Sequence, residues 1–139
     1  MSYTSTFIQV AEDCPTTESI IPPAKGNSTP IHLIQYDLLQ NEPYTYSHEE
    51  LVFAVYVARQ GITKAELAER RDELWADLFQ KGHPCLRASA LTKRYGWGAH
   101  YNEEGKIALY GMESAQYQEF VQSDEVKLLK AMRNKRASK

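Results

Sequence analysis

The stretch WGAHY-NEEG-KIALY, residues 97–110, places two runs rich in aromatic and aliphatic residues on either side of a polar turn that contains a glycine. Short apolar runs joined by such a turn are typical of a β-hairpin. The hairpin decides the fold class, because it requires an antiparallel sheet and helices to cover that sheet. We therefore expect it to lie beside the other strands of the chain.

The hairpin register follows from the length of its loop. With residues 102–105 as the loop, Tyr101 pairs with Lys106 and Trp97 pairs with Tyr110. The first face then carries Trp97, Tyr101, Lys106 and Tyr110, and the second carries Gly98, His100, Ile107 and Leu109. The second face is typical of a core. The first is either a platform of exposed aromatics, suited to stacking on a base or sugar, or a surface that a helix covers.

Two further segments are expected to complete the sheet. Residues 6–10 are β-branched and aromatic and end before an acidic pair, and a short extended piece begins at Cys85. The predicted fold class is α+β: a small antiparallel sheet made of the N-terminal strand, the Cys85 strand and the 97–110 hairpin, packed with about five helices.

Capping patterns predict three helices before residue 83. Thr29 begins the first, which Pro43 ends. A capping box opens a second helix over about 48–60, whose β-branched interior would equally suit a buried strand. The third begins after Thr63 and carries an apolar stripe up to Gly82.

Serine caps predict the remaining helices. Ser89 starts a single turn, and Ser114 and Ser123 each start a longer helix. The apolar residues of the last helix are Val126, Leu128, Leu129 and Met132. A flexible loop is expected at about 15–30 and a basic tail at about 133–139, within a single domain of 139 residues.

The start and composition of the chain indicate its compartment. The first basic side chain is Lys25, so a secretory signal is not expected, and the longest apolar run, 51–58, is too short to cross a membrane. We expect a cytoplasmic protein in which Cys14 and Cys85 are reduced thiols.

The net charge of −2 conceals two opposite halves. Residues 1–80 carry 5 basic and 12 acidic side chains, whereas residues 81–139 carry 11 basic and 6 acidic ones. The total excludes a uniformly basic protein, but the positive half allows a local site for an anion. Alternatively, the halves neutralise each other within the fold or across a dimer.

The binding hypothesis uses the run 81–101, which contains four basic residues and no acid. It predicts a non-catalytic binding or regulatory module for an anionic small molecule or nucleic acid, without a membrane partner; whether the chain forms a homo-oligomer stays open. The expected binding residues are Arg87, Lys93, Arg94, Trp97, His100, Tyr101 and Tyr110.

An enzyme is the alternative reading. His83 and Cys85 lie two residues apart, and with His100 they suggest a nucleophilic thiol with a histidine base. The zinc-deaminase pattern is excluded because Ala88 stands where its second cysteine would be, and no phosphate loop occurs. No metal or cofactor is therefore expected. A third reading is an adaptor that docks a protein through the 15–30 loop or the C-terminal helix.

The stretches PCLRASALTKRYGWG at 84–98 and GKIALYG at 105–111 resemble a family of short microbial proteins described only as a domain of unknown function. The similarity extends over nearly the whole chain. It implies a single-domain protein and assigns no catalytic residue.

Overall fold

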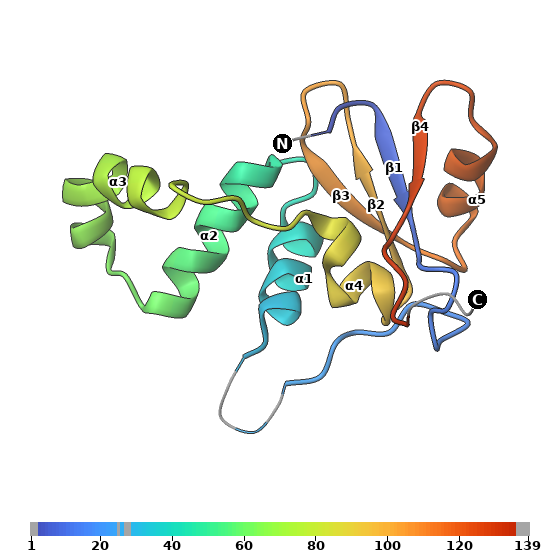
Figure 1. The fold of residues 1–139 in the computed structure, drawn as a ribbon, viewed down its shortest axis with the longest axis horizontal. Coiled ribbons are helices and arrows are strands. Elements are labelled where there is room, and N and C mark those ends of the chain that lie inside the picture. Colours follow the sequence, from blue (N-terminus) through green and yellow to red (C-terminus); the bar gives the residue numbers. More distant parts are fainter. Residues whose placement is uncertain (1–2, 25, 27–28, 136–139) are drawn as a thin grey trace.

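The computed structural model describes residues 3–24, 26 and 29–135. Four strands form one mixed sheet in the order β3-β2-β1-β4 (Figure 1). The strands are β1 (Thr6–Gln9), β2 (Trp97–Tyr101), β3 (Ile107–Gly111) and β4 (Lys127–Lys130). β2 is antiparallel to both β1 and β3, whereas β4 is parallel to β1. The α+β class is confirmed.

Helices cover both faces of this sheet. The helical elements of the chain are α1 (Ile31–Asn41), α2 (His48–Gln60), α3 (Lys64–Leu78), the 3-10 turn η1 (Leu86–Ala88), α4 (Ala90–Lys93) and α5 (Ala115–Gln122). The rings of Tyr36 in α1 and Trp97 in β2 are in contact on one face, and Phe7 of β1 contacts Tyr117 of α5 on the other. In Figure 1, α3 lies at the end of the molecule farthest from α5.

Two predicted elements are wrong. Cys85 does not belong to a strand but is the residue that caps the start of η1. The segment after Ser123 forms the strand β4 rather than a helix. The short apolar run of 126–132 suits either structure, and pairing with β1 decides it: Lys127 N donates to Ser5 O, and Ala131 N donates to Gln9 O.

The third helix also ends earlier than Gly82. α3 stops at Leu78, and Phe79 leaves the helix with its ring against Trp75 and His83. His83 Nε2 lies 2.6 Å from the Leu78 carbonyl oxygen. A side-chain donor therefore satisfies one of the carbonyls at the helix end.

The hairpin register is shifted by one residue from the predicted one. Tyr101 pairs with Ile107 and Trp97 pairs with Gly111, because the loop contains residues 102–106. Asn102 closes it: its Oδ1 accepts from the backbone N–H groups of Glu104 and Lys106. A shift of one residue moves side chains to the opposite face relative to their partners.

The first part of the predicted 15–30 loop is anchored to the sheet. Ile20 N donates to Tyr95 O, and the indole Nε1 of Trp97 donates to Ile20 O. Ser19 donates to both carboxylate oxygens of Glu113. Residues 25 and 27–28 of this loop, and 136–139 of the predicted tail, lie outside the described residues. Among the described residues, no helix is both long and apolar enough to cross a membrane.

Candidate functional site

A groove opens beside the N-terminal half of α1. It consists of two hollows of ≈ 220 and ≈ 230 Å³, which share Ile31, Gln35 and Pro84 as lining residues. The first hollow reaches to α2 and the end of α3, and the second reaches to η1 and the start of α4. We call the two together the α1 groove.

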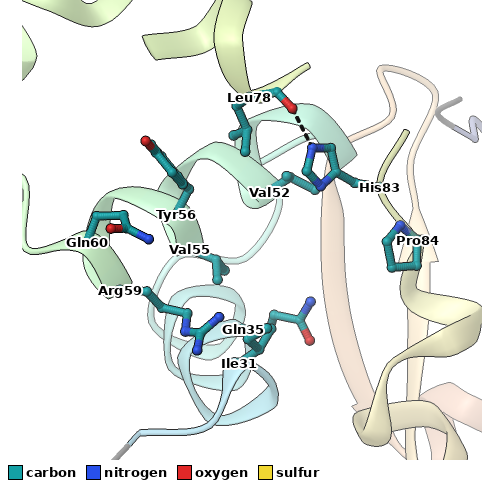
Figure 2. Close-up of a pocket in the computed structure, with 10 residues that line it drawn as sticks. All are labelled: Ile31, Gln35, Val52, Val55, Tyr56, Arg59, Gln60, Leu78, His83 and Pro84. Carbon is teal, nitrogen blue, oxygen red and sulfur yellow. Dashed lines mark hydrogen bonds between the residues drawn. The ribbon is translucent and has the colours of Figure 1, made fainter. Parts of the chain in front are cut away.

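The first hollow is lined mainly by apolar side chains (Figure 2). Its apolar lining consists of Ile31, Val52, Val55, Leu78 and Pro84. Ile31 is the first residue of α1 and is 45% exposed. A concave apolar surface with a few polar groups is typical of small-molecule sites.

Arg59 supplies a positive charge at this hollow. It lies in the last turn of α2, and Figure 2 shows its side chain reaching toward α1, where Ile31 and Gln35 lie. The ion pairs that the described residues form do not include Arg59. Its guanidinium is therefore available to an anionic ligand.

His83 is held in place at the opposite side of the same hollow. Because a carbonyl oxygen can only accept, Nε2 of His83 carries the hydrogen that it donates to Leu78, and Nδ1 is left for other partners. The neighbouring His48 is buried, and burial lowers its pKa, an effect that Glu49 and the His83 backbone partly oppose. His83 thus contributes a fixed imidazole to the groove.

The second hollow is lined by Cys85 and by three other polar residues, His32, Gln35 and Ser89. Two of these are joined, since Ser89 Oγ donates to Gln35 Oε1 at 2.8 Å. Cys85 is half-buried, and its Sγ lies 3.4 Å from the hydroxyl of Tyr3. The hydrogen bond to Cys85 is the main cause that raises the pKa of Tyr3, while Arg87 acts in the opposite direction. Arg87 therefore lies near the Tyr3–Cys85 pair.

Two of the expected binding aromatics are in the core. Trp97 is 9% exposed and Tyr101 is fully buried, and both belong to the face of the sheet that α1 covers. Of the two alternatives for this face, an exposed platform and a surface covered by a helix, the covered surface is correct for Trp97 and Tyr101. An exposed platform of Trp97, Tyr101, Lys106 and Tyr110 is therefore wrong. The shifted register places Tyr110 opposite Gly98, on the other face of the sheet.

His100 and Tyr110 lie together on the α5 face. Their rings both contact Phe120 of α5. Because His100 and Tyr101 are neighbours in a strand, they point to opposite faces, and Tyr101 contacts Tyr3, the partner of Cys85. The sheet thus separates His100 from Cys85, which rules out the predicted role of His100 as a base for that thiol. His83 and Cys85 line different hollows of the α1 groove.

Two of the three expected basic residues contact the C-terminal segment instead of the groove. Arg87 Nε donates to Lys130 O at 2.8 Å, and the carbonyl of Lys93 accepts from Asn134 Nδ2 at 2.8 Å. Arg94 is exposed nearby in sequence. The structure thus places both Arg87 and Lys93 against the C-terminal segment that contains Lys130 and Asn134. Trp97 and Tyr101 are buried, so they do not form an exposed site together with these basic residues.

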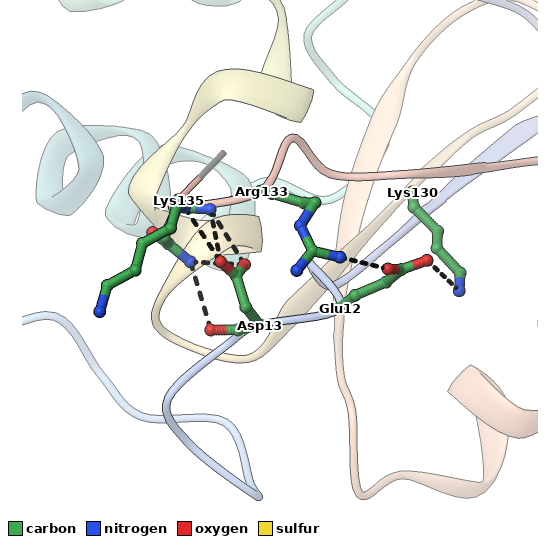
Figure 3. A network of polar contacts seen from close by, with 6 residues as sticks. Glu12, Asp13, Lys130, Arg133 and Lys135 are labelled. Carbon is green, nitrogen blue, oxygen red and sulfur yellow. Dashed lines mark hydrogen bonds and ion pairs between the residues drawn. The ribbon is translucent and has the colours of Figure 1, made fainter. Parts of the chain in front are cut away.

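Acidic residues hold this segment from the other side (Figure 3). Glu12 forms ion pairs with Lys130 at 3.1 Å and with Arg133 at 2.7 Å. Asp13 accepts from the backbone N–H groups of Asn134 and Lys135. These contacts lower the pKa of both carboxyl groups. We call Glu12, Asp13 and their partners the C-terminal clamp.

The ion pairs favour internal neutralisation of the two charged halves. Among the residues that the structure describes, three ion pairs join partners distant in sequence: Glu12–Lys130, Glu12–Arg133 and Glu50–Lys106. Each joins an acidic residue of the first half to a basic residue of the second. Part of the positive half is therefore already paired.

The part of the chain that the structure describes holds no group of three or more histidine, cysteine, aspartate or glutamate side chains placed to bind a metal ion.

Comparison with protein-family models places the chain in a family. Residues 1–137 match the family described as "Family of unknown function (DUF6157)". The chain belongs to this family. Neither the curated proteins nor the solved structures include a match to it. Membership of DUF6157 agrees with the sequence resemblance and assigns no activity, so the site of this DUF6157 chain has to be argued from its geometry.

Sequence reasoning missed the groove residues of α1 and α2. Gln35, Tyr56 and Arg59 belong to no motif, and they approach the 83–90 segment only because α1 and α2 pack together. The sequence offered one indication of the groove, which is the apolar residue Ile31 at the first position of a predicted helix.

Proposed function

We propose that this protein is a non-catalytic binding module whose α1 groove takes a small organic anion with an apolar body and a carboxylate. The observation that carries the proposal is Arg59, a cation outside the ion pairs described above, beside an apolar hollow of ≈ 220 Å³. The expected anionic ligand is kept, but its site moves from the hairpin to the groove.

The groove offers an apolar surface for the body of such a ligand and polar groups for its carboxylate. Burying an apolar body against Ile31, Val55 and Pro84 removes apolar surface from water. A carboxylate can form a bidentate pair with the guanidinium of Arg59, and the amides of Gln35 and Gln60 add donors in the same hollow.

A small anion is favoured over nucleic acid because of how the basic residues are used. Lys106, Lys130 and Arg133 are in ion pairs. Nucleic-acid binding usually needs a continuous set of available cations along the phosphate backbone. Both cysteines are free thiols, which fits the cytoplasm as the compartment that we propose.

The test uses two ligands that share a ring system and differ in charge. Indole-3-acetate and tryptamine are titrated into the full-length protein, and backbone amide resonances are followed by NMR. We expect indole-3-acetate to shift resonances of α1 and α2 and tryptamine to leave them unchanged. Arg59→Gln should weaken binding about tenfold or more, as expected for loss of a charge-assisted pair. Arg94→Gln, an exposed arginine outside the groove, is the matched control. Equal binding of both ligands, or binding that Arg59→Gln does not change, would refute the proposal.

A further inference from the structure

We infer that the ligand of the α1 groove carries a hydrogen-bond donor at the end opposite its carboxylate, and that Nδ1 of His83 accepts from this donor. The inference rests on the function proposed above and narrows its ligand class to aromatic carboxylic acids with an N–H or O–H group on the ring system. It also makes His83 the residue that selects between ligands with and without that group.

His83 and Arg59 lie at opposite sides of the first hollow. Arg59 belongs to the last turn of α2. Ring contacts run from His83 through Phe79 and Trp75 to Phe53, which lies in the first half of α2. Figure 2 shows the same arrangement, with the two side chains separated by the apolar lining. The hollow therefore offers one polar group to each end of a ligand.

The apolar wall between these two groups is one face of α2. Val52, Val55 and Arg59 follow one another at helical spacing, and all three line the hollow. The positions from 52 to 59 span about 10 Å along the helix axis. A hydrogen bond of about 3 Å at each end leaves room for one compact aromatic ring system between them. The hollow of ≈ 220 Å³ agrees with this size, since an apolar cavity of about 150 Å³ holds one benzene molecule.

Nδ1 of His83 is the acceptor that the ligand meets. Nε2 lies 2.6 Å from the carbonyl oxygen of Leu78 and carries the hydrogen of that bond. In the neutral imidazole, the other ring nitrogen then has a lone pair. The hydrogen bonds between described residues leave Nδ1 unused, and Figure 2 shows it turned away from Leu78. The helix end thus fixes both the orientation and the tautomer of this ring.

The surroundings of Nδ1 explain why a donor on the ligand matters. Val52, Leu78 and Pro84 line the same hollow as the imidazole. A ligand seated there removes water from Nδ1, and a buried acceptor without a donor is unfavourable. A ring N–H or O–H replaces the lost water, whereas a sulfur atom or a methylene group does not. Ligands that differ only in this group should therefore differ in affinity.

The experiment compares two carboxylates of nearly equal shape. Indole-3-acetate has a ring N–H, and 1-benzothiophene-3-acetate has a sulfur atom in its place. Each is titrated into the full-length protein at about pH 8, where the neutral form of histidine is favoured, and Kd is measured by NMR. We expect indole-3-acetate to bind about threefold to tenfold more tightly, as for one hydrogen bond between uncharged groups. Equal values of Kd would overturn the inference.

Substitutions of His83 assign the difference to this residue. His83→Phe removes the acceptor and keeps an aromatic ring against Phe79. It should raise Kd of indole-3-acetate to that of the benzothiophene compound and leave the latter unchanged. His83→Asn places an amide oxygen near the position of Nδ1 and should retain part of the preference. Arg94→Gln, outside the groove, is the control. If His83→Phe weakened both ligands equally, His83 would only shape the hollow and the inference would be wrong.

The imidazole of His83 reports the contact directly. Two-bond ¹H–¹⁵N spectra should show the Nε2–H tautomer in the free protein. Indole-3-acetate should shift the Nδ1 resonance, and the benzothiophene compound should leave it in place. A hydrogen on Nδ1 in the free protein, or an Nδ1 resonance that indole-3-acetate does not move, would contradict the proposed contact.

Failure of this inference differs from failure of the proposed function. If both compounds bind equally and Arg59→Gln weakens both about tenfold, the anion groove stands and the donor site is overturned. If neither compound binds, or if Arg59→Gln changes neither Kd, the anion groove is overturned together with the inference.

Discussion

The hydroxyl of Tyr44 lies 2.8 Å from Nδ1 of His100. The backbone of Tyr44 has a φ of 59°, which few non-glycine residues adopt. The same hydroxyl lies 2.7 Å from that of Tyr110. Backbone bonds hold the strained residue at β3: Tyr44 N donates to Ile107 O, and Ile107 N donates to Tyr46 O. The segment between α1 and α2 thereby places the hydroxyl of Tyr44 against His100 and Tyr110, on the face of the sheet that α5 covers.

Tyr44→Phe should therefore destabilise the protein. The substitution keeps the ring and the backbone but leaves Nδ1 of His100 and the hydroxyl of Tyr110 without their partner. We expect a loss of about 1–3 kcal/mol in the free energy of unfolding, measured by urea denaturation. Tyr46→Phe is the control, since the hydroxyl of Tyr46 donates to the exposed carboxylate of Glu42 at the surface. Equal effects of the two substitutions would mean that the His100–Tyr44–Tyr110 cluster contributes nothing specific.

Stability should also fall as the pH decreases through the range in which histidine titrates. Burial lowers the pKa of both His48 and His100, so each binds a proton less readily in the folded than in the unfolded state. Protonation therefore favours unfolding. The loss should begin below the unfolded pKa of about 6.5 and continue until the pH passes the lower folded value.

NMR titration of the histidine ring protons checks the cause of this pH dependence. The midpoints of His48 and His100 should both lie below the value of an unfolded peptide. Midpoints at or above that value would contradict the prediction. Titration of carboxylates does not overlap with this pH range. Carboxyl groups with a lowered pKa, such as Glu50 beside Lys106, lose their contribution to the free energy of unfolding only at more acidic pH.

Local sequence signals located the helices well where caps were present. The capping box at Ser47 forms as expected, with Glu50 reaching back to Ser47 N, and α2 ends at Gly61. The serine caps at Ser89 and Ser114 are also present. These signals succeed because each cap satisfies backbone groups within a few residues, independently of the rest of the fold.

The errors occurred where distant partners decide the structure. β4 depends on pairing with β1, more than a hundred residues earlier, and the local spacing of Leu128 and Leu129 could not reveal it. The hairpin register depended on one extra loop residue, set by the side chain of Asn102. The groove was missed because it joins α1, α2 and the 83–90 segment only after they pack. From the sequence, His83 and Cys85 were identified as a chemically distinctive pair, but not Arg59.

The C-terminal clamp should hold residues 131–135 against the body of the protein. Asp13 accepts two backbone N–H groups there, so Asp13→Ala should increase the rate of amide hydrogen exchange at Asn134 and Lys135. The protection factors of these amides, which correct for the intrinsic pH dependence of exchange, should also decrease as the pH falls below the unfolded pKa of aspartate toward the lower folded value, because backbone N–H donors such as that of Asn134 lower the pKa of Asp13 by favouring its charged form. Glu18→Ala provides the comparison on the same loop. Unchanged exchange at Asn134 and Lys135 would mean that Asp13 does not hold this segment.

Gly98 should tolerate no side chain, because β2 passes directly beneath two aromatic rings. A Cβ at this position would lie 2.5 Å from Cζ of Phe7 and 2.7 Å from Cε2 of Tyr117, closer than carbon atoms approach. Phe7 is fully buried and stacks on Phe120, so it has no room to withdraw. Gly98→Ala should therefore lower the free energy of unfolding by about 1–3 kcal/mol or more, through overpacking between the sheet and α5. Gly82→Ala is the matched control, because nothing lies within 4 Å of its added Cβ. Urea denaturation of both variants tests the packing, and a Gly98→Ala protein as stable as Gly82→Ala would show that α5 does not lie on β2 as described.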